Sequence, residues 1–388
     1  MPPLNPLPAL ASDDLATWDR AWMTRALALA QRGLGYVEPN PMVGCVIVRD
    51  GLCIGEGFHR RCGGDHAEVD ALKSLGGPSL ATGATAYVTL EPCCHYGKTP
   101  PCTEALLAAG VQRVVVAMRD PFPQVDGGGI QCLRRAGVTV DVGIEQAAAE
   151  DLNAPYLKRL QRHRPWVIAK WAMTMDGRIA TVSGDSQWIS GELSRGEVHR
   201  LRGRVDAVIV GGGTAAADNP TLTARPAGPR TALRVVFVGR RMPVLDSNLI
   251  QSVDAGPVMF VTGPDCDPHS LAAVKQRGVE VLTCQARDSG AQVGELLDEL
   301  GRRQMTNVLL EGGAGLIASF AAIDEVDEIH TFLAAKIVGG VDAPGPIGGS
   351  GISKLADSVA YRLRDVARFD QDVRVIVRRV REQYRLDP

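Results

Sequence analysis

The sequence predicts a protein of two α/β domains, and three observations lead to this prediction. The chain has 388 residues, which is long for one hydrophobic core, since domains usually contain about 100 to 200 residues. Apolar runs typical of buried strands alternate with segments of helical apolar spacing in both halves. The pair Arg164-Pro165 interrupts this alternation, because proline ends a helix. We therefore expect one domain over residues 13–160 and another over 161–388.

The first half predicts a sheet covered by helices, because strands and helices alternate along it. Apolar spacing indicates a helix over 18–32, then a buried strand over 43–48 with a hairpin partner over 54–58. Another helix is expected to have His66 in its first turn. The remaining elements are predicted as strand 86–90, helix 103–109, strand 111–118, helix 130–135, strand 138–142 and one helix over 145–163.

The second half repeats the alternation of strands and helices. Strands are predicted over 166–173, 207–210, 234–238, 258–261, 279–282, 308–310 and 328–332, and helices over 194–202, 271–276, 293–303 and 316–322. Glycine runs follow two of these strands, at 211–213 and 312–315, where backbone amides can hold a phosphate. Each fits a loose dinucleotide pattern but lacks the acidic residue expected about 20 positions later. The pair Arg240-Arg241 suits either the 2′-phosphate of NADP or a solvated loop.

Composition argues against nucleic acid and membranes as partners. The net charge is −2, whereas a nucleic-acid binder usually carries a basic face. Residues 1–12 have no basic segment and no sustained apolar run, so they predict neither a signal peptide nor a membrane span. The nine cysteines are an odd number and fit thiols and a metal better than disulfides. We expect a soluble cytoplasmic protein.

Three residues of the first half form a candidate zinc site. His66, Cys93 and Cys102 provide one imidazole and two thiolates, which leaves the fourth position of a tetrahedral zinc ion open to water, as in catalytic sites. Glu68 follows two residues after the histidine and is our candidate proton carrier. His-x-Glu with a downstream Pro-Cys is the signature of zinc nucleobase deaminases.

Other interpretations of these residues remain open at this stage. They are also compatible with a core histidine, a surface acid and two buried thiols. Eight residues separate the two cysteines, where deaminases usually have two. Cys94 and His95 are alternative ligands, although the side chain of Cys94 would have to turn back to reach the same metal.

Longer motifs carry a resemblance that extends from about Trp18 over nearly the whole chain. In the first half they are Asn40-Pro41-Met42-Val43-Gly44, Gly55-Glu56-Gly57-Phe58-His59, the insertion at 94–101 and Asp120-Pro121. In the second half they are Lys170-Trp171-Ala172-Met173-Thr174-Met175-Asp176-Gly177, Ser186-Gln187-Trp188, Ala217-Asp218-Asn219-Pro220 with Leu222 and Arg225, and Glu311-Gly312-Gly313. The chain thus resembles the bifunctional deaminase/reductase family of riboflavin biosynthesis.

This resemblance implies both the fold and the activity. It implies an N-terminal three-layer α/β/α domain like that of cytidine deaminase and a C-terminal α/β domain like dihydrofolate reductase. The first would use zinc to deaminate 2,5-diamino-6-ribosylamino-4(3H)-pyrimidinone 5′-phosphate. The second would use NADPH to reduce the ribosyl chain of the product to ribityl. The family also implies a homodimer or larger assembly.

The resemblance assigns contacts to both sites. In the deaminase, the implied substrate contacts are Asn40, His59, Lys98 and Asp120. In the reductase, they are Lys170, Ser186, Arg202, Leu222, Arg225 and Glu311, and the implied NADPH contacts are Ala172, Trp188, Thr214, Asp218, Gly313, Ala314 and Gly315. Arginine also fits phosphate on independent grounds. Lys170 within an apolar strand is costly to bury unless it is paired.

The chain departs from the family pattern near the first site, where Cys94 replaces a serine and Phe122, Asp126 and Gly128 replace polar, small or basic residues. Two substrate contacts are therefore in question. Two rival functions remain open, a nucleoside or tRNA deaminase fused to an unrelated reductase and a zinc-stabilised binding module without catalysis. Activity on cytidine would indicate the first, and absence of any turnover would indicate the second.

Overall fold

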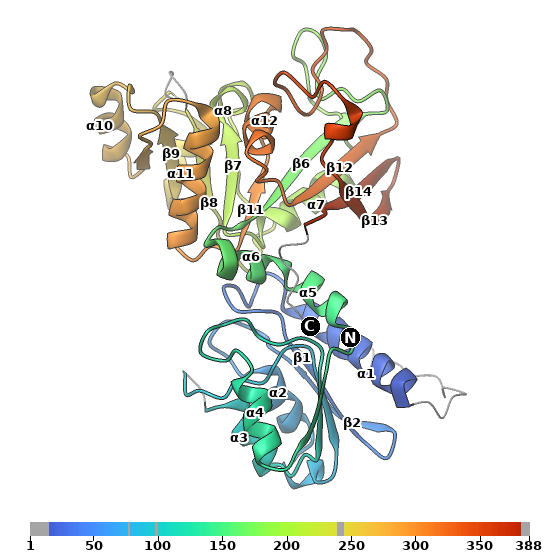
Figure 1. Cartoon of the computed structure of the whole chain (residues 1–388). Coiled ribbons are helices and arrows are strands. Elements are labelled where there is room, and N and C mark those ends of the chain that lie inside the picture. The colour runs from blue at the N-terminus through green and yellow to red at the C-terminus, as the bar shows by residue number, and fades with distance from the viewer. Residues whose placement is uncertain (1–14, 77, 98–99, 239–243, 382–388) are drawn as a thin grey trace. The chain divides into compact units, whose positions relative to one another are not determined.

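A computed structural model describes residues 15–76, 78–97, 100–238 and 244–381. The described residues up to Gln161 form one compact unit, and those from Arg162 onward form a second. Figure 1 shows the helices and strands of each unit. The domain limits predicted above, 13–160 and 161–388, stay a prediction.

The first unit contains a five-stranded sheet in the order β2-β1-β3-β4-β5. The strands are β1 (Gly44–Arg49), β2 (Leu52–Phe58), β3 (Thr85–Val88), β4 (Arg113–Val116) and β5 (Thr139–Val142). β1 runs antiparallel to β2 and β3, which confirms the predicted hairpin, whereas β3, β4 and β5 are parallel. The carboxyl ends of β3 and β4 therefore lie at one edge of the sheet.

Helices cover both faces of this sheet, as expected for a three-layer α/β/α unit. The helices are α1 (Leu15–Ala30), α2 (Ala67–Ser74), α3 (Cys102–Ala108), α4 (Gly128–Arg135), α5 (Gln146–Leu152) and α6 (Ala154–Arg162). Because side chains alternate along a strand, Cys45 and Ile47 pack in the core beneath α2, α3 and α4, whereas Val46 and Val48 pack in the core beneath α1.

The single helix predicted over 145–163 is wrong, because the chain forms α5 and α6 with a break at Asn153. The Asn153 side chain accepts a hydrogen bond from the Met42 amide at 2.8 Å and donates one to the Met42 carbonyl at 3.0 Å. Asn153 is 1% exposed, so these bonds satisfy buried backbone groups of a distant segment. A tertiary contact of this kind leaves no local pattern in the sequence.

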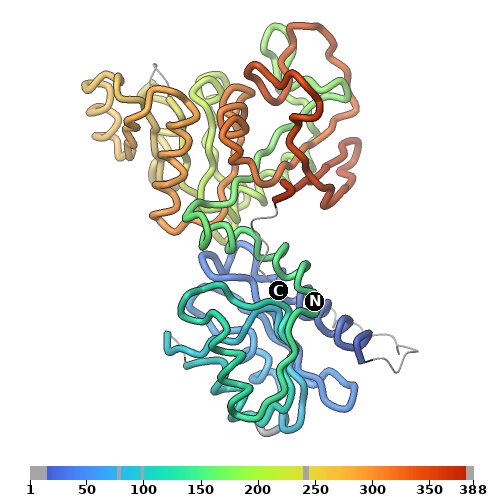
Figure 2. Tube along the Cα trace, in the orientation of Figure 1, coloured from blue at the N-terminus to red at the C-terminus, as the bar shows by residue number. Residues whose placement is uncertain are grey.

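The second unit contains a nine-stranded sheet in the order β10-β9-β8-β7-β11-β6-β12-β14-β13. Its strands are β6 (Trp166–Thr174), β7 (Ala207–Gly211), β8 (Leu233–Phe237), β9 (Val258–Thr262), β10 (Glu280–Thr283), β11 (Asn307–Leu310), β12 (Glu328–Ala334), β13 (Tyr361–Phe369) and β14 (Asp372–Arg379). In this order, each strand from β10 across the sheet to β12 is parallel to its neighbour. The hairpin β13-β14 adds two antiparallel strands at the end next to β12. This hairpin, dark red in Figure 2, was not predicted.

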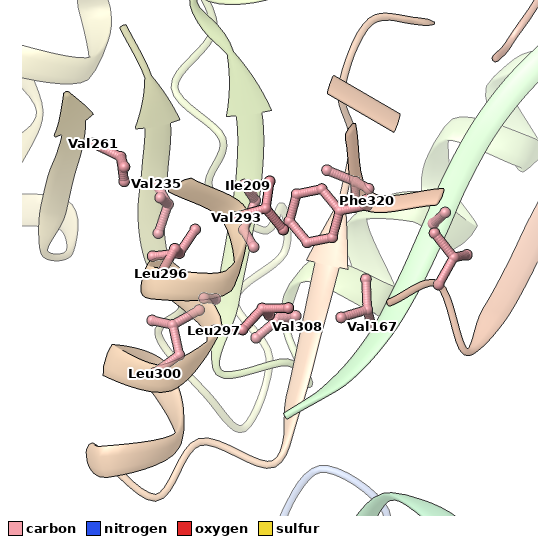
Figure 3. Close-up of a cluster of buried hydrophobic side chains, with 14 of the residues drawn as sticks. Val167, Ile209, Val235, Val261, Val293, Leu296, Leu297, Leu300, Val308 and Phe320 are labelled. Carbon is pink, nitrogen blue, oxygen red and sulfur yellow. The ribbon is translucent and has the colours of Figure 1, made fainter. Parts of the chain in front are cut away.

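The helices of the second unit are α7 (Glu192–Arg202), α8 (Gly212–Asp218), α9 (Asn248–Gln251), α10 (Pro268–Gln276), α11 (Ser289–Arg302) and α12 (Ala314–Ala322). Leucines of α11 and Phe320 of α12 pack on one face of the sheet against Val167, Ile209, Val235 and Val308 (Figure 3). Residues that alternate with these, among them Lys170 and Arg234, lie on the opposite face.

We predict that Asn153→Ala destabilises the first unit by about 1–3 kcal/mol, because it leaves the buried Met42 amide and carbonyl without partners. Urea unfolding of the full chain, followed by a probe in the first unit, would measure this loss. Gln131→Ala, at an exposed position of α4, is the control and should change stability little. Equal losses in the two variants would contradict the role assigned to Asn153.

Candidate active sites

The three predicted metal ligands meet in the first unit. His66 is the residue that precedes α2, Cys102 is the first residue of α3, and Cys93 lies in the segment after β3. His66 Nδ1 lies 3.2 Å from Cys102 Sγ and 3.5 Å from Cys93 Sγ. All three ligand atoms lie within 4.8 Å of one another. His66 thus sits just before its helix instead of in the first turn.

This geometry fits a tetrahedral zinc ion. With Zn–N near 2.0–2.1 Å and Zn–S near 2.3 Å, neighbouring ligand atoms should be about 3.6–3.8 Å apart. The two distances from His66 Nδ1 to the sulfur atoms, 3.2 and 3.5 Å, are slightly shorter than this. A small expansion of the site would therefore accommodate the ion. Among the described residues, this is the one group of three or more histidine, cysteine and acidic side chains with metal-ligand spacing. The alternatives Cys94 and His95 are not part of it.

The start of α3 favours a thiolate at Cys93. The backbone amide of Cys102 donates to Cys93 Sγ at 3.3 Å, and the amide of Thr103 donates to the Cys93 carbonyl at 3.2 Å. A hydrogen bond from the Cys102 thiol, helped by His66, lowers the pKa of Cys93 to about 4. The same thiolate and burial raise the pKa of Cys102. A metal cation opposes that second effect because it binds the deprotonated thiol.

Glu68 lies in the first turn of α2 beside the ligands and is 3% exposed. Burial raises the pKa of its carboxyl group, and the nearby charge of Cys93 adds to this rise. A raised pKa brings the carboxyl group closer to neutral pH, which is the direction that general acid–base catalysis needs.

Asn40 and His59 lie next to His66. The His59 ring packs edge-on against the His66 ring with centroids 5.5 Å apart. His59 Nδ1 lies 2.8 Å from the carbonyl of Asp65, so Nδ1 carries the proton and Nε2 accepts from the Asn40 amide at 3.2 Å. Burial lowers the pKa of His59, which favours this neutral form.

Asp120 follows β4 and is nearly buried in the same unit. Its Oδ1 accepts hydrogen bonds from the Tyr156 hydroxyl and from the Phe122 amide, both at 3.0 Å. Burial raises the pKa of Asp120 to about 6. Lys98, the fourth predicted substrate contact of this site, lies outside the described residues.

Glu91 organises the loop after Asp120 and was missed by sequence reasoning. Its carboxylate accepts from the backbone amides of Asp120, Gly127 and Ile130 at 3.2, 3.0 and 3.1 Å. A Cβ atom at Gly129 would lie 1.9 Å from the carbonyl oxygen of Pro92, so only glycine allows this close approach. The position of Glu91 directly before Pro92-Cys93 was the one signal available in the sequence.

The departures from the family pattern cluster in this loop. The Phe122 ring lies 6.3 Å from the His95 ring between centroids. A Cβ atom at Gly128 would lie 2.9 Å from Cys94 Sγ. The larger side chain at position 94 thus occupies space beside a residue that has no side chain. Asp126 pairs at 3.0 Å with Arg119, a basic residue of the same loop.

The second candidate site lies between two neighbouring parallel strands, β7 and β11, whose connections lead to opposite sides of the sheet. From β7 the chain continues through α8 to β8, and from β11 it continues through α12 to β12 on the other side. Ligands of open α/β sheets bind at such a switch point, outside the carboxyl ends of the strands. The two glycine runs lie at these ends, and each leads into a helix.

A charged cluster occupies the face of the sheet beside this point. Arg202 of α7 donates two hydrogen bonds to the Glu311 carboxylate at 2.6 and 2.9 Å. Burial opposes ionisation of Glu311, but Arg202 and Lys170 outweigh it and lower its pKa. Burial and Arg202 lower the pKa of Lys170, and Glu311 opposes this. The negative charge of Glu311 thus offsets the positive charge of Lys170. This agrees with the expectation that a lysine in an apolar strand needs a partner of opposite charge.

Several predicted cofactor residues come together at the switch point. A Cβ atom at Gly313 would lie 3.3 Å from Thr214 Oγ1, which places the two glycine runs in contact. Gln187, next to Trp188, donates to Asp218 at 3.3 Å. The Trp188 side chain is 62% exposed. Ala314 and Gly315 are the first residues of α12, and Ala172 is half-buried on β6.

The remaining substrate contacts come from two irregular segments. Ser186 is half-buried in the segment between β6 and α7. Leu222 is 3% exposed and has φ 57°, an uncommon value for leucine. Arg225 is exposed and donates to Thr221 Oγ1 at 3.3 Å. His199, which sequence reasoning missed, shares this region, because Arg202 and Arg225 add to burial in lowering its pKa.

The fold and the two sites define a zinc-dependent deaminase joined to a reductase, and comparison with known proteins agrees. Residues 16–118 match the cytidine and deoxycytidylate deaminase zinc-binding region. Residues 165–375 match the RibD C-terminal domain. The chain belongs to the RibD family of riboflavin biosynthesis proteins.

Relatives match over almost their whole lengths. The riboflavin biosynthesis protein RibD of Actinobacillus pleuropneumoniae is 40% identical over 370 residues, which cover 95% of this chain and 96% of the relative. RibD of Escherichia coli is 37% identical, and the match covers 92% of this chain and 98% of that relative. The solved structure of Acinetobacter baumannii RibD, form 2, has a TM-score of 0.79 at 37% identity. The match covers 95% of this chain and 100% of that chain.

These findings confirm the predicted fold class, the two enzyme activities and the cofactors. The chain is a hydrolase and oxidoreductase of riboflavin biosynthesis that uses zinc and NADPH. The match to the RibD C-terminal domain also supports the reductase domain implied by the resemblance over the loose dinucleotide pattern of the glycine runs. No helix in the described part of the chain has the length and apolar character needed to span a membrane.

We predict that Asp120→Asn stabilises the first unit by about 1–3 kcal/mol at pH 8 and by less at pH 5.5. The pKa of Asp120 is raised from 3.8 to about 6, so folding favours the neutral acid. That contribution is complete below pH 4 and is lost as the pH rises through 6, whereas asparagine stays neutral. Urea unfolding at saturating zinc at both pH values tests this, with the exposed Asp50→Asn as control. A gain independent of pH would contradict it.

Proposed function

We propose that the first unit removes an amino group from 2,5-diamino-6-ribosylamino-4(3H)-pyrimidinone 5′-phosphate and that the second reduces the ribosyl chain of the product. The solved relative from Thermotoga maritima, 34% identical with a TM-score of 0.79, is described as a diaminohydroxyphosphoribosylaminopyrimidine deaminase and 5-amino-6-(5-phosphoribosylamino)uracil reductase. Its match covers 95% of this chain and 100% of that chain. The ligand geometry of His66, Cys93 and Cys102 is the observation that carries the proposal.

In the deaminase step, His66, Cys93 and Cys102 hold zinc, which supplies a positive charge that acidifies water. Glu68 takes a proton from the water that attacks the ring carbon and gives a proton to the departing ammonia. Its burial next to the ligands supports this role. Asn40, His59, Lys98 and Asp120 bind the pyrimidine and its ribose phosphate. The neutral His59 presents a fixed hydrogen-bonding edge to Asn40, which orients the amide.

When bound, NADPH would supply the hydride that reduces C1 of the sugar. Lys170 and Glu311 orient the ribose and move protons, because they are half-buried groups of opposite charge beside the switch point that shift each other's pKa. Ser186, Arg202, the Leu222 backbone and Arg225 bind the phosphoribosyl part. Ala172, Trp188, Thr214, Asp218 and residues 313–315 bind the cofactor, and the helix start at Ala314 suits its phosphates.

We also propose a homo-oligomer, a dimer or larger, in the cytoplasm, without nucleic acid or membrane as partner. The edge strand β13 exposes Leu363 and Val366, at 64% and 56%, and such apolar surface often marks a protein contact. The net charge of −2 speaks against a nucleic-acid partner. Sedimentation of the purified chain would measure its mass in solution.

We predict that Glu68→Gln lowers deaminase turnover about 10²–10⁴-fold, because the amide cannot carry a proton. Ammonia release from the diamino substrate measures this turnover. Zinc content and NADPH oxidation with the deaminated substrate should stay near wild type, which separates a lost proton carrier from a lost fold. Retained ammonia release would contradict the role of Glu68.

We predict the converse for Lys170→Met, which removes the ammonium group but keeps the length of the side chain. NADPH oxidation with the deaminated substrate should fall about 10²-fold or more, and ammonia release should not change. Arg164→Met, which breaks ion pairs with Asp298 and Glu325 before β6 begins, serves as control for loss of a partly buried charge in the same unit. Equal effects of the two variants would contradict the role of Lys170.

A further inference from the structure

Arg234 of β8 is a buried cation that has no acidic partner among the described residues. Its side chain is 1% exposed and lies on the face of the sheet opposite Val235. Burial lowers the pKa of its guanidinium, and no acidic group in the described part of the chain opposes this. A buried charge of this kind is unfavourable, and an aliphatic side chain would fill a strand of this type more easily. The hydrogen bonds of its guanidinium group explain why an arginine occupies this position.

The guanidinium bonds to the backbone of two irregular segments. One of its terminal nitrogens, Nη1, donates to the Thr221 carbonyl at 3.1 Å and to the Ser252 hydroxyl at 2.7 Å. The other, Nη2, donates to the Ser252 carbonyl at 2.7 Å and to the Gly256 carbonyl. The planar fork of arginine can make these bonds at once in fixed directions, which lysine cannot do.

The Thr221 carbonyl belongs to the segment 219–225, which carries two proposed substrate contacts. This segment has no helix or strand of its own. Leu222, directly after Thr221, has the left-handed φ of 57°, a conformation that persists only where the surroundings hold it. Arg225 donates to the side chain of the same Thr221. Fixing Thr221 therefore holds the Leu222 backbone beside it and the hydroxyl group that the Arg225 guanidinium contacts.

Other anchors hold the flanks of this segment. The Asn219 side chain accepts from the Asn248 amide at 2.9 Å, and the Asn219 carbonyl accepts from the Asn248 side chain at 2.7 Å. The His199 ring contacts the backbone of Thr223. Arg234 lies between these anchors and supports the residue next to the strained leucine.

We infer that Arg234 is a positioning residue of the reductase, which preforms the segment 219–225 for the phosphoribosyl part of the substrate. This inference rests on the proposed roles of Leu222 and Arg225. Without the guanidinium, the segment would have to become ordered when substrate binds, and that ordering weakens binding. The proposed NADPH contacts Thr214 and Gly313 lie outside this segment.

Steady-state NADPH oxidation by the full-length, zinc-loaded enzyme with the deaminated substrate tests the inference. Arg234→Met should raise the KM for the pyrimidine phosphate about tenfold and leave the KM for NADPH and the rate of ammonia release unchanged. Arg234→Lys should lie between Met and wild type. Ser252→Ala, which keeps the guanidinium, should raise the same KM by a smaller factor and is informative if Arg234→Met does not fold.

The controls separate the possible explanations. Arg164→Met should leave both KM values unchanged. A lower melting temperature and smaller active fraction for Arg234→Met, with both KM values unchanged, would mean that Arg234 serves the fold alone and would overturn the inference. Arg225→Gln tests the underlying proposal separately. If it does not raise the KM for the pyrimidine phosphate, the substrate role of this segment fails, whereas a rise with Arg225→Gln alone refutes only the role of Arg234.

Discussion

Both active sites depend on the constraint that neighbouring parallel strands end at the same edge of a sheet. In the first unit, β3 and β4 are parallel, so the segments that follow them bring Cys93 and Asp120 to one edge. In the second, β7 and β11 are parallel, so Thr214 and Gly313 meet although about a hundred positions separate them in the sequence. The strands supply rigid attachment points, and the residues that perform chemistry lie in the segments beyond them.

The two units use buried carboxylates in opposite ways. Burial beside a thiolate raises the pKa of Glu68, and this group is proposed to accept and release protons. The bidentate contact with Arg202 lowers the pKa of Glu311 despite its burial. The fixed anion then balances the charge of Lys170. Separate environments thus give chemically similar side chains different tasks within one chain.

Irregular segments around both sites are held by buried polar side chains that bind backbone groups. Glu91 accepts from three amides of the loop after Asp120, and Arg234 donates to three carbonyl groups around the segment 219–225. Asn153 does the same for Met42. A buried backbone group without a partner is costly, so each of these side chains stabilises one particular loop conformation.

The sequence by itself determined the candidate zinc ligands that the structure brings together, the order of most strands and helices, and the membership of both halves in a deaminase/reductase family. It could do so because ligand chemistry, apolar periodicity and motifs are properties of residue types at short spacings. Only the tertiary structure decided the break at Asn153, the hairpin β13-β14 and the roles of Glu91 and Arg234. Each of these depends on partners far away in the sequence, such as Met42 for Asn153 and Ser252 for Arg234, and a polar residue within an apolar run does not indicate which distant backbone group it binds.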